Sequence, residues 1–403
     1  MTDIKGRIPR RVLAVMEALA AAGHRGYLVG GSLRDLLLGV TPHDYDLTTD
    51  ATPEEMLVAF SDFRVIPTGL KHGTLTVLSD GESVEVTTHR VDGTYTDSRR
   101  PDSVAFTGEL AEDLSRRDFT VNAMAWHPEI GLVDLFGGRD DLARGMLRAV
   151  GDPRVRFTED ALRILRAFRF SAQLDFTVEE NTQLAARDCR EGLARISVER
   201  VFAELTRLLA SPAAARGLSA LLRAGCAPYV FFDLPPASEG VEKLDGLSPD
   251  AALRLAYLLR GHDHAAVREL CRRWHAPNAF ADGVCGLLCA IAEPLPDSPY
   301  TARRYVTRHW RGWQGAMEIL SACGVQASRA CELCRTVARD GSAVELRRLA
   351  LNGREVQELV GVRPEDTAAA LARLQDHVWR VPTDNKKHLL LEVAKKLFAK
   401  EQK

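Results

Sequence analysis

The sequence has no apolar run long enough to cross a membrane. Among its 403 residues, no stretch of about eighteen consecutive apolar residues occurs. The first residues, Met1 to Lys5, also lack the apolar segment of a secretion signal. These two absences predict a cytoplasmic protein with no membrane partner.

The sequence also lacks the regular cysteine spacing of a disulfide framework. Its 8 cysteines begin only at Cys189, and we expect them to be reduced thiols. Cys331 and Cys334 have a spacing found in zinc sites, but no second Cys or His pair follows at the distance that such a site needs. The sequence therefore does not favour a structural zinc ion.

Neither sign of charge dominates the chain. The formal net charge of −2 excludes a general electrostatic attraction to nucleic acid, so any such binding must come from local basic patches. A length of 403 residues exceeds that of one compact core and predicts several domains.

Two glycines follow a short apolar run near the N-terminus. Residues 27–29 predict a strand, and Gly30 and Gly31 predict a tight turn. A helix is expected next, capped by Ser32 and ended by Gly39. Glycines let backbone N–H groups approach a ligand closely, and the start of a helix adds donors with a partial positive charge. The segment therefore predicts a phosphate-binding turn.

Two carboxylates follow this turn. Asp44 and Asp46 alternate with Tyr45 on a predicted strand, so both should project from the same face. Oxygen ligands of this kind suit Mg²⁺. Alone, a Gly-Gly pair is usually a simple turn and an Asp-x-Asp pair a solvated strand edge. Their combination favours a site for a metal ion and a phosphate group.

Residues 1–147 mix helix and strand signals and predict a domain with both. Thr52 and Glu55 form the pattern of a helix-capping box, and Asp80-Gly81 predicts a hairpin turn. Glu85 follows on the second hairpin strand. We expect it either to face water or to form a third acidic group beside Asp44 and Asp46.

A polar, glycine-containing stretch after the hairpin has almost no apolar anchor, so we expect a flexible loop. Its marked residues are Asp92, Gly93, Tyr95, Asp97, Arg99 and Arg100. Arg116 and Arg117 follow, and fixed cations of this kind near a phosphate-binding turn would neutralise a polyphosphate.

From Gly151 onward the pattern is helical, and residues 159–170 predict a helix with a polar line of four residues. These are Asp160, Arg163, Arg166 and Arg169. They can be read as ion pairs on a wet helix surface. Alternatively, a carboxylate that accepts from an amino group and a guanidinium that donates to a ring nitrogen would fit cytosine and adenine. Uracil and guanine present the opposite order, so Asp160 and Arg163 would then be a protein template.

A later helical segment mixes cations with aromatic residues. Its arginines are Arg303, Arg304, Arg308 and Arg311, which lie among Tyr305, Trp310 and Trp313. Such a patch can hold RNA phosphates and stack on bases, but aromatic residues at helical spacing are as often part of a core. Both interpretations stay open.

Four motifs occur in a characteristic order along the first half of the chain. They are Gly-Gly-x-x-Arg-Asp from Gly30, Asp-x-Asp from Asp44, Arg-Arg-Asp-Phe-Thr-x-Asn-Ala from Arg116, and Glu-Asp-x-x-Arg-x-x-Arg-Ala-x-Arg-Phe from Glu159. This ordered set resembles the bacterial class II tRNA nucleotidyltransferases, the CCA-adding enzymes. The rest of the chain resembles that family only in its length and helical character.

The resemblance implies an α+β fold with a polymerase-β-like nucleotidyltransferase head and a mixed sheet, followed by all-α domains. The expected boundaries are 1–147 for the catalytic head, 148–212 for a neck that recognises the base, 213–300 for the body and 301–403 for a tail that binds tRNA. The implied activity is template-independent addition of C, C and A to the 3′ end of tRNA. CTP and ATP would be the substrates, and pyrophosphate would be released. The sequence leaves a monomer and a homodimer equally open.

The resemblance also implies roles for individual residues. Asp44 and Asp46 would hold Mg²⁺ for a two-metal mechanism. Glu85 is a further candidate ligand from its place in the hairpin and not from the resemblance. Nucleotide binding would fall to Gly30, Gly31, Arg34, Arg117, Asp160, Arg163, Arg166 and Arg169. The loop from Asp92 to Arg100 resembles the one associated with adding the terminal A, which argues against a CC-only enzyme.

Three other functions remain as alternatives. An A-adding tRNA nucleotidyltransferase and a poly(A) polymerase share the head motifs. An RNA-binding protein without catalytic activity would have no need for Asp44 and Asp46 together.

Overall fold

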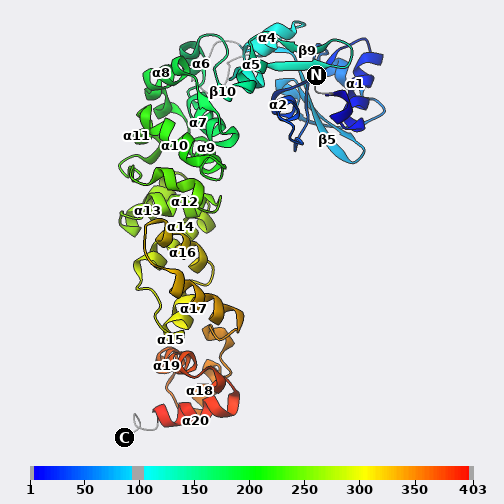
Figure 1. Cartoon of the computed structure of the whole chain (residues 1–403). Helices are drawn as coiled ribbons and strands as arrows, with labels where there is room; N and C mark the ends of the chain where they lie inside the picture. The colour runs from blue at the N-terminus through cyan, green and yellow to red at the C-terminus, as the bar shows by residue number, and fades with distance from the viewer. Residues whose placement is uncertain (1–3, 93–103, 399–403) are drawn as a thin grey trace. The chain divides into compact units, whose positions relative to one another are not determined.

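The structure is a computed structural model that describes residues 4–92 and 104–398. The chain divides into two compact units, Met1–Asp245 with Arg273–His275, and Gly246–Arg272 with Ala276–Lys403. Strands occur in the first unit, and the described part of the second unit contains helices (Figure 1). The four domain boundaries expected from the sequence stay a prediction.

The first unit contains a large mixed sheet. The strands of this unit are β1 (Gly26–Val29), β2 (Asp46–Thr49), β3 (Arg64–Gly69), β4 (Thr74–Ser79), β5 (Glu82–Thr88), β6 (Arg90–Asp92), β7 (Val104–Phe106), β8 (Met124–His127), β9 (Gly131–Asp134), β10 (Met146–Leu147) and β11 (Thr177–Val178). Seven of them form one sheet in the order β3-β4-β5-β2-β1-β8-β9. The sheet is mixed because β2 and β5 are parallel while the other neighbours are antiparallel.

Helices surround this sheet and continue beyond it. Those of the first unit are α1 (Arg10–Ala21), α2 (Gly30–Leu37), α3 (Pro53–Ala59), α4 (Leu110–Ser115), α5 (Gly138–Ala143), α6 (Pro153–Glu159), α7 (Leu162–Leu174), α8 (Glu180–Asp188), α9 (Val198–Leu209), α10 (Ala214–Arg223) and α11 (Ala227–Phe231). Short 3-10 helices are η1 (Lys5–Arg7), η2 (Leu70–His72), η3 (Thr120–Asn122) and η4 (Arg190–Arg195).

Local sequence signals predicted several of these elements correctly. Asp80 and Gly81 join β4 to β5 with φ of 52° and 81°, the left-handed backbone that a tight hairpin needs. Thr52 and Glu55 form the predicted capping box at the start of α3. One expectation was wrong, because β11 pairs with β10 beyond Gly151, where only helices were predicted.

The main core lies between one face of the sheet and the helices that cover it. Val15 and Leu19 of α1 pack with Leu28 and Leu47 of the central strands. Phe170 of α7 belongs to the same buried cluster, since its side chain is only 6% exposed. The sheet and α7 therefore share one apolar core, which fixes α7 against the sheet.

Two expectations about the glycine turn are corrected by the structure. Helix α2 begins at Gly30 rather than after Ser32, so Ser32 lies in its first turn. Its hydroxyl donates to Val29 O at 2.8 Å and accepts weakly from Asp46 N at 3.4 Å. Ser32 thus connects α2 to β2 instead of capping the helix. Similarly, β2 begins at Asp46, and Asp44 lies in the bend before it.

The second unit is helical throughout its described residues. It contains η5 (Val241–Gly246, shared with the first unit), α12 (Ala251–Leu258), α13 (His264–Arg273), α14 (Asn278–Ala292), α15 (Pro299–Arg308), α16 (Trp313–Ala322), α17 (Ser328–Arg339), η6 (Leu346–Arg348), α18 (Gly353–Val360), η7 (Pro364–Asp366), α19 (Thr367–Arg380), η8 (Pro382–Asp384) and α20 (Lys387–Phe398). All 8 cysteines of the chain are free thiols. Among the helices of the described chain, none has the length and apolar character needed to span a bilayer.

The end of α2 gives a test of the backbone argument. Val40 N donates to Asp35 O and Gly39 N to Leu36 O, a pattern that requires the left-handed φ of 84° at Gly39. Replacing Gly39 with Ala should lower the free energy of unfolding by about 1 kcal/mol, because a Cβ disfavours this backbone while meeting no atom within 4 Å. Urea unfolding measures the difference.

Gly108 is the matched control for this substitution. A Cβ there also meets open space, but the backbone has no left-handed φ. Gly108→Ala should therefore leave stability unchanged or raise it slightly. Equal losses in both variants would contradict the role given to Gly39.

Candidate active site

Three carboxylates lie close together at the start of β2. Asp46 is the first residue of this strand and lies opposite Val29 of β1 and Glu85 of the parallel neighbour β5. Burial and the neighbouring charge of Glu85 raise the pKa of Asp46, and Asp44 raises it further, against the opposing effect of Arg117. A negative charge on Asp46 is thus disfavoured by its surroundings, which makes the position attractive to a cation.

The turn at Gly30 leaves room beside these acids. Gly30 has φ of 69°, and a Cβ on it would lie 3.3 Å from Arg117 Nη1 and 3.7 Å from Asp46 Oδ2. Only a glycine therefore keeps the space between this cation and this carboxylate open. Next to it, Arg34 Nη2 lies 3.6 Å from the position of a Cβ on Gly31. The predicted phosphate-binding glycines and the predicted cations do meet in the fold.

Arg117 is held in place by a carboxylate that the sequence analysis did not identify. Asp113 of α4 is fully buried and accepts from Arg117 Nη2 at 3.1 Å and from Arg116 Nη2 at 2.7 Å. Burial alone would raise the pKa of Asp113, but Arg117 and Arg116 overcome this effect and lower it to about 2. Asp113 is therefore ionised at neutral pH and fixes both arginines.

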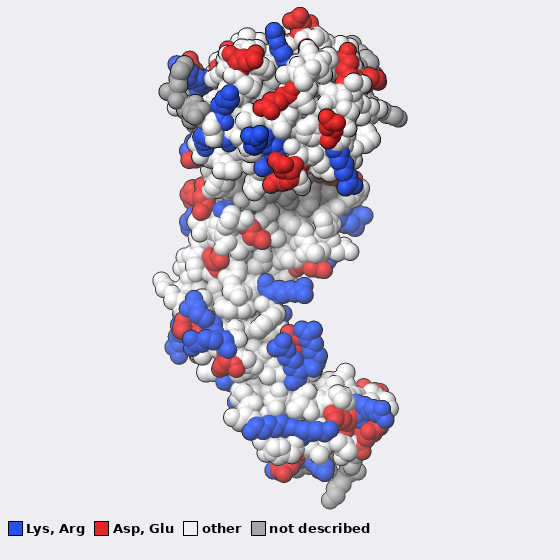
Figure 2. All heavy atoms as spheres, turned by 90° about the vertical axis from the view of Figure 1, so that its right-hand side faces the viewer, with Lys and Arg blue, Asp and Glu red and all other residues white. Residues whose placement is uncertain are grey.

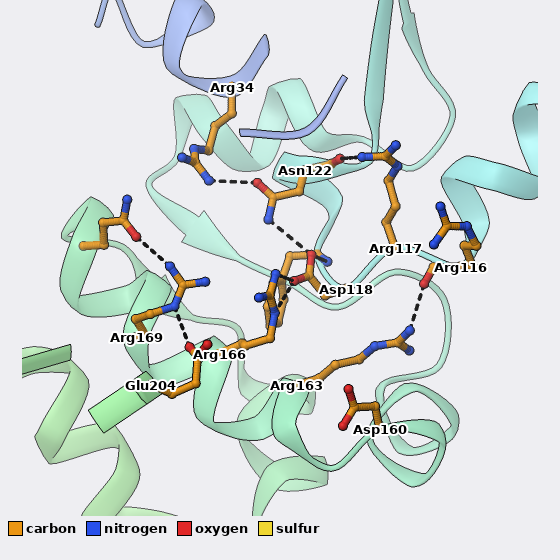
Figure 3. A network of polar contacts seen from close by, with 12 residues as sticks. Arg34, Arg116, Arg117, Asp118, Asn122, Asp160, Arg163, Arg166, Arg169 and Glu204 are labelled. Atoms are coloured by element: carbon orange, nitrogen blue, oxygen red, sulfur yellow. Dashed lines mark hydrogen bonds and ion pairs between the residues drawn. The ribbon is translucent and has the colours of Figure 1, made fainter. Parts of the chain in front are cut away.

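Asn122 and Asp118 connect Arg34 of α2 with Arg166 of α7, as Figure 3 shows. Asn122 accepts from Arg34 Nη1 at 2.9 Å and donates to Asp118 Oδ1 at 3.2 Å. Asp118 Oδ2 in turn accepts from Arg166 of α7 at 2.9 Å and 2.6 Å. Burial acts to raise the pKa of Asp118, but Arg166 and Asn122 lower it to about 2.

The other arginines of α7 are also fixed by acceptors from different elements. Arg169 donates to Glu204 of α9 at 2.6 Å, and its guanidinium lies 3.7 Å from the centre of the Phe170 ring. Arg163 donates to Glu159 at 2.7 Å and to the backbone oxygen of Arg116 at 3.0 Å (Figure 3). The predicted line of arginines is therefore held by partners from several elements, and Arg163 and Arg169 are buried rather than lying on a wet helix surface.

The structure corrects the expected helix around Asp160. Helix α6 ends at Glu159 and α7 begins at Leu162, so Asp160 has an extended backbone with φ of −138°. Its Oδ2 accepts from Arg200 of α9 at 3.0 Å, and its Oδ1 from Leu162 N. Asp160 thus pairs with Arg200, and Arg163 pairs with Glu159. The ion pair between Asp160 and Arg163 that the surface interpretation predicted is therefore replaced by two others.

Sequence reasoning missed four polar residues that organise the site, namely Asp113, Asp118, Asn122 and Arg200. Asp118 and Asn122 belong to the Arg-Arg-Asp-Phe-Thr-x-Asn motif, which was a usable signal. Asp113 precedes Arg116 and Arg117 by one helical turn, a spacing that allows such pairs. Arg200 gave no local signal, since its partner lies 40 positions away.

The basic and aromatic patch of the second unit is partly a core. Tyr305 and Trp313 are buried, and Arg303 donates to Ser342 Oγ and Trp379 O. Arg308 pairs with Glu293, whereas Arg304 and Arg311 are exposed. Figure 2 shows Lys and Arg side chains in separate groups between stretches of uncharged surface.

The flexible-loop prediction mostly falls outside the described residues. Gly93, Tyr95, Asp97, Arg99 and Arg100 all lie there, and only the backbone of Asp92 is placed, at the end of β6.

Known families and relatives match the part of the chain that contains this site. The chain matches the family described as Poly A polymerase head domain over residues 26–148. It also matches the probable RNA and SrmB-binding site of polymerase A over residues 175–237. It is 42% identical over 277 residues to a CCA-adding enzyme of Streptococcus sanguinis, which covers 68% of this chain and 69% of the relative. A CCA-adding enzyme of Geobacillus stearothermophilus is 39% identical and covers 72% of each chain.

Solved structures give the same result for the fold. The Bacillus stearothermophilus CCA-adding enzyme in complex with CTP has a TM-score of 0.84 at 30% identity, over 98% of both chains. A Thermotoga maritima CCA-adding enzyme complexed with tRNA has a TM-score of 0.69 at 20% identity, covering 98% of this chain and 97% of the other.

The fold and the site define a nucleotidyltransferase, with a polymerase-β-like head followed by helical domains. The expected α+β architecture with a mixed sheet is therefore confirmed. The chain belongs to the CCA-adding enzymes, the tRNA nucleotidyltransferases that complete the 3′ end of tRNA. This assignment also confirms the predicted activity. Enzymes of this class generally use a divalent metal ion.

The buried pair of Asp118 and Arg166 predicts a pH-dependent loss of stability. Replacing Asp118 with Asn should lower the free energy of unfolding at pH 7 by roughly 2 to 4 kcal/mol, because Arg166 loses its buried counterion. The folded pKa of Asp118 lies below its ordinary value, so this stabilisation is present above about pH 4 and fades as the pH falls toward 2. Urea unfolding at pH 7 and at pH 3 measures both values.

Asp188→Asn is the control, since Asp188 forms an exposed ion pair with Arg154. That change should cost less than about 1 kcal/mol. An Asp118→Asn effect of the same size at both pH values would contradict the account.

Proposed function

We propose that Asp44 and Asp46 hold the divalent metal ion of this enzyme and that the ion is Mg²⁺. The observation that carries the proposal is the position of Asp46, which lies opposite Glu85 in the sheet, two residues after Asp44, with its Oδ2 beside the open turn at Gly30. Two or three hard oxygen donors fit this ion. When bound, Mg²⁺ lowers the pKa of the attacking 3′-hydroxyl of tRNA and stabilises the departing pyrophosphate.

The proposed site leaves room for substrate oxygens around the ion. Among residues 4–92 and 104–398, no three His, Cys, Asp or Glu side chains are arranged to hold a metal. This fits an ion bound by two carboxylates and completed by water and phosphate oxygens, a usual arrangement for Mg²⁺. Glu85 then acts on the charge of Asp46, and its role as a third ligand stays a prediction.

The triphosphate is proposed to bind at the turn of Gly30 and Gly31. Arg117 lies against Gly30 and supplies one cation, while Arg34 lies against Gly31 and supplies the second. Because Asp113 and Asn122 hold these arginines before substrate arrives, little order has to be created on binding.

Base selection is proposed to rest on Asp160 and Arg163. Asp160 accepts from the amino group of cytosine or adenine, and Arg163 donates to the adjacent ring nitrogen. Arg200 holds Asp160 through its Oδ2, and Glu159 holds Arg163. Arg166 and Arg169 complete the pocket wall. The substrates would then be CTP and ATP, selected without a nucleic-acid template, as in the predicted addition of C, C and A to tRNA.

The remaining predictions belong to the same proposal. The exposed arginines Arg304 and Arg311 would contact tRNA, with smaller parts for Arg303 and Arg308 because both already have protein partners. The head, neck, body and tail boundaries, the role of the loop in adding the terminal A, and a cytoplasmic location complete it.

Replacing Asp46 with Asn tests the metal assignment. The variant should lose on the order of a thousandfold in the rate of nucleotide transfer, because an amide holds a divalent cation poorly. The dissociation constant for tRNA, measured by filter retention, should stay within about twofold, since RNA phosphates are bound by cations and hydrogen-bond donors and not by a carboxylate such as Asp46.

Asp80→Asn is the matched control, a carboxylate in the hairpin turn of the same sheet. It should keep full activity. Full activity in Asp46→Asn would remove the metal assignment, and equal loss in both variants would point to a structural effect.

Replacing Asp160 with Ala tests base selection. Loss of the acceptor should reduce the preference for CTP over UTP by at least about tenfold, because a buried hydrogen bond discriminates between the two base edges. Single-nucleotide incorporation on tRNA that lacks its CCA end measures the ratio of kcat/KM values. Asp188→Ala changes an exposed carboxylate of α8 and should leave the ratio unchanged. An unchanged ratio in Asp160→Ala would count against the protein template.

A further inference from the structure

Asp113 is the most deeply buried carboxylate near the active site, and no step of the proposed reaction uses it directly. Its side chain is fully buried and is approached by five donor atoms of four residues. Arg116 supplies two of these, at 2.7 Å and 3.0 Å, and Arg117 supplies one, at 3.1 Å. The hydroxyl of Thr48 in β2 and the backbone N–H of Arg90 in β6 add weaker contacts at 3.4 Å each. The carboxylate is therefore fixed from several directions.

Arg117 lies between this carboxylate and the proposed metal ligand. Its Nη2 donates to Asp113, while its Nη1 lies near Gly30 and donates weakly to Asn122 O at 3.5 Å. Asp46 Oδ2 lies on the other side of the same glycine, 3.7 Å from the position of a Cβ on Gly30, while Arg117 Nη1 lies 3.3 Å from that position. Arg117 is thus within the field of two carboxylates and hydrogen-bonds to only one of them.

One donor of Arg117 is buried and has no partner. Its Nε is inaccessible to solvent and makes no hydrogen bond within the described chain. An unsatisfied buried donor on a cation is unfavourable until an acceptor reaches it. Nη1 of the same guanidinium lies against the glycine turn where the triphosphate is proposed to bind, so an anionic phosphate oxygen is the chemistry that this side of Arg117 fits.

We propose that Asp113 is a positioning residue that holds Arg117 away from Asp46. This inference rests on the proposed metal and triphosphate roles of Asp46 and Arg117. With Asp113 ionised, Arg117 has a fixed counterion, Asp46 stays free for a divalent cation, and the remaining donors of Arg117 stay free for phosphate.

Without the negative charge of Asp113, electrostatic attraction would draw Arg117 toward another carboxylate. A buried guanidinium that loses its carboxylate moves toward the next available one, because an unpaired buried charge is costly. For Arg117 that acid is Asp46, because Arg117 Nη1 and Asp46 Oδ2 lie 3.3 Å and 3.7 Å from the same point, the position of a Cβ on Gly30. The resulting pair would neutralise the metal ligand and occupy the donors meant for the triphosphate.

The test uses Asp113→Asn in the full-length protein with two binding measurements. Binding of Mn²⁺ is followed by electron paramagnetic resonance, and binding of CTP is measured by equilibrium dialysis in EDTA, where no metal contributes. Both dissociation constants should rise by on the order of tenfold, the effect of one charged hydrogen bond. Asp113→Glu keeps the charge and should restore Mn²⁺ affinity to within about twofold of wild type. Normal affinities in a folded Asp113→Asn protein would overturn the proposal.

A double-mutant cycle separates positioning from general structural damage. Arg117→Gln alone should weaken metal-free CTP binding but leave Mn²⁺ affinity equal to or above that of wild type. In the Arg117→Gln background, adding Asp113→Asn should cause no further loss of Mn²⁺ affinity, because the competing cation is gone. A further loss of tenfold would overturn the proposal.

The remaining variants keep the proposal testable and separate it from the metal assignment. If Asp113→Asn does not fold, the Mn²⁺ affinity of Arg117→Gln decides, since a loss there contradicts competition with Asp46. Glu179→Gln removes the helix-capping carboxylate of α8 and should leave both affinities unchanged. Undiminished Mn²⁺ binding in Asp46→Asn would refute the metal assignment. Lost binding there, with an unaffected Asp113→Asn, would refute only the role of Asp113.

Discussion

The ion pair between Asp118 and Arg166 is the interaction on which the arrangement of the active site depends. Asp118 directly follows Arg116 and Arg117, whereas Arg166 lies on α7. The pair therefore joins the residues proposed to bind the triphosphate to the helix proposed to recognise the base. Phe170, one turn further along α7, packs in the sheet's own core. Apolar packing therefore brings α7 to the sheet, and the charged pair fixes its position. Buried ion pairs cost desolvation, which fits a role in geometry more than in net stability.

The site as a whole follows one electrostatic rule. The arginines proposed to bind the nucleotide are already held by partners, for example Arg34 by Asn122, Arg117 by Asp113, and Arg169 by Glu204. At the start of β2, by contrast, burial and the charges of Glu85 and Asp44 raise the pKa of Asp46. In the proposed function, cations are thus placed in advance for a polyanionic substrate, while Asp44 and Asp46 remain for a divalent ion. Such preorganisation is what phosphoryl-transfer catalysis requires of a protein.

The sequence predicted the features that depend on neighbouring residues. The hairpin at Asp80-Gly81, the capping box of Thr52 and the helix end at Gly39 are confirmed because each is decided by local backbone geometry. The cap at Ser32 and the unbroken helix through Asp160 were wrong. In both cases a tertiary contact, to Asp46 N and to Arg200, changed what the side chain does. Asp113 was missed because its significance depends on complete burial, which no local pattern reveals. The family motifs located the site, but only the fold shows which polar partners organise it.

The central claim is that protein side chains select the nucleotides which this enzyme adds. The most direct measurement gives the purified protein tRNA that lacks its CCA end, together with CTP, ATP, UTP and GTP, and sequences the products. The account predicts C, C and A in that order, with UTP and GTP left unused. Incorporation of all four nucleotides alike, or of none, would contradict it.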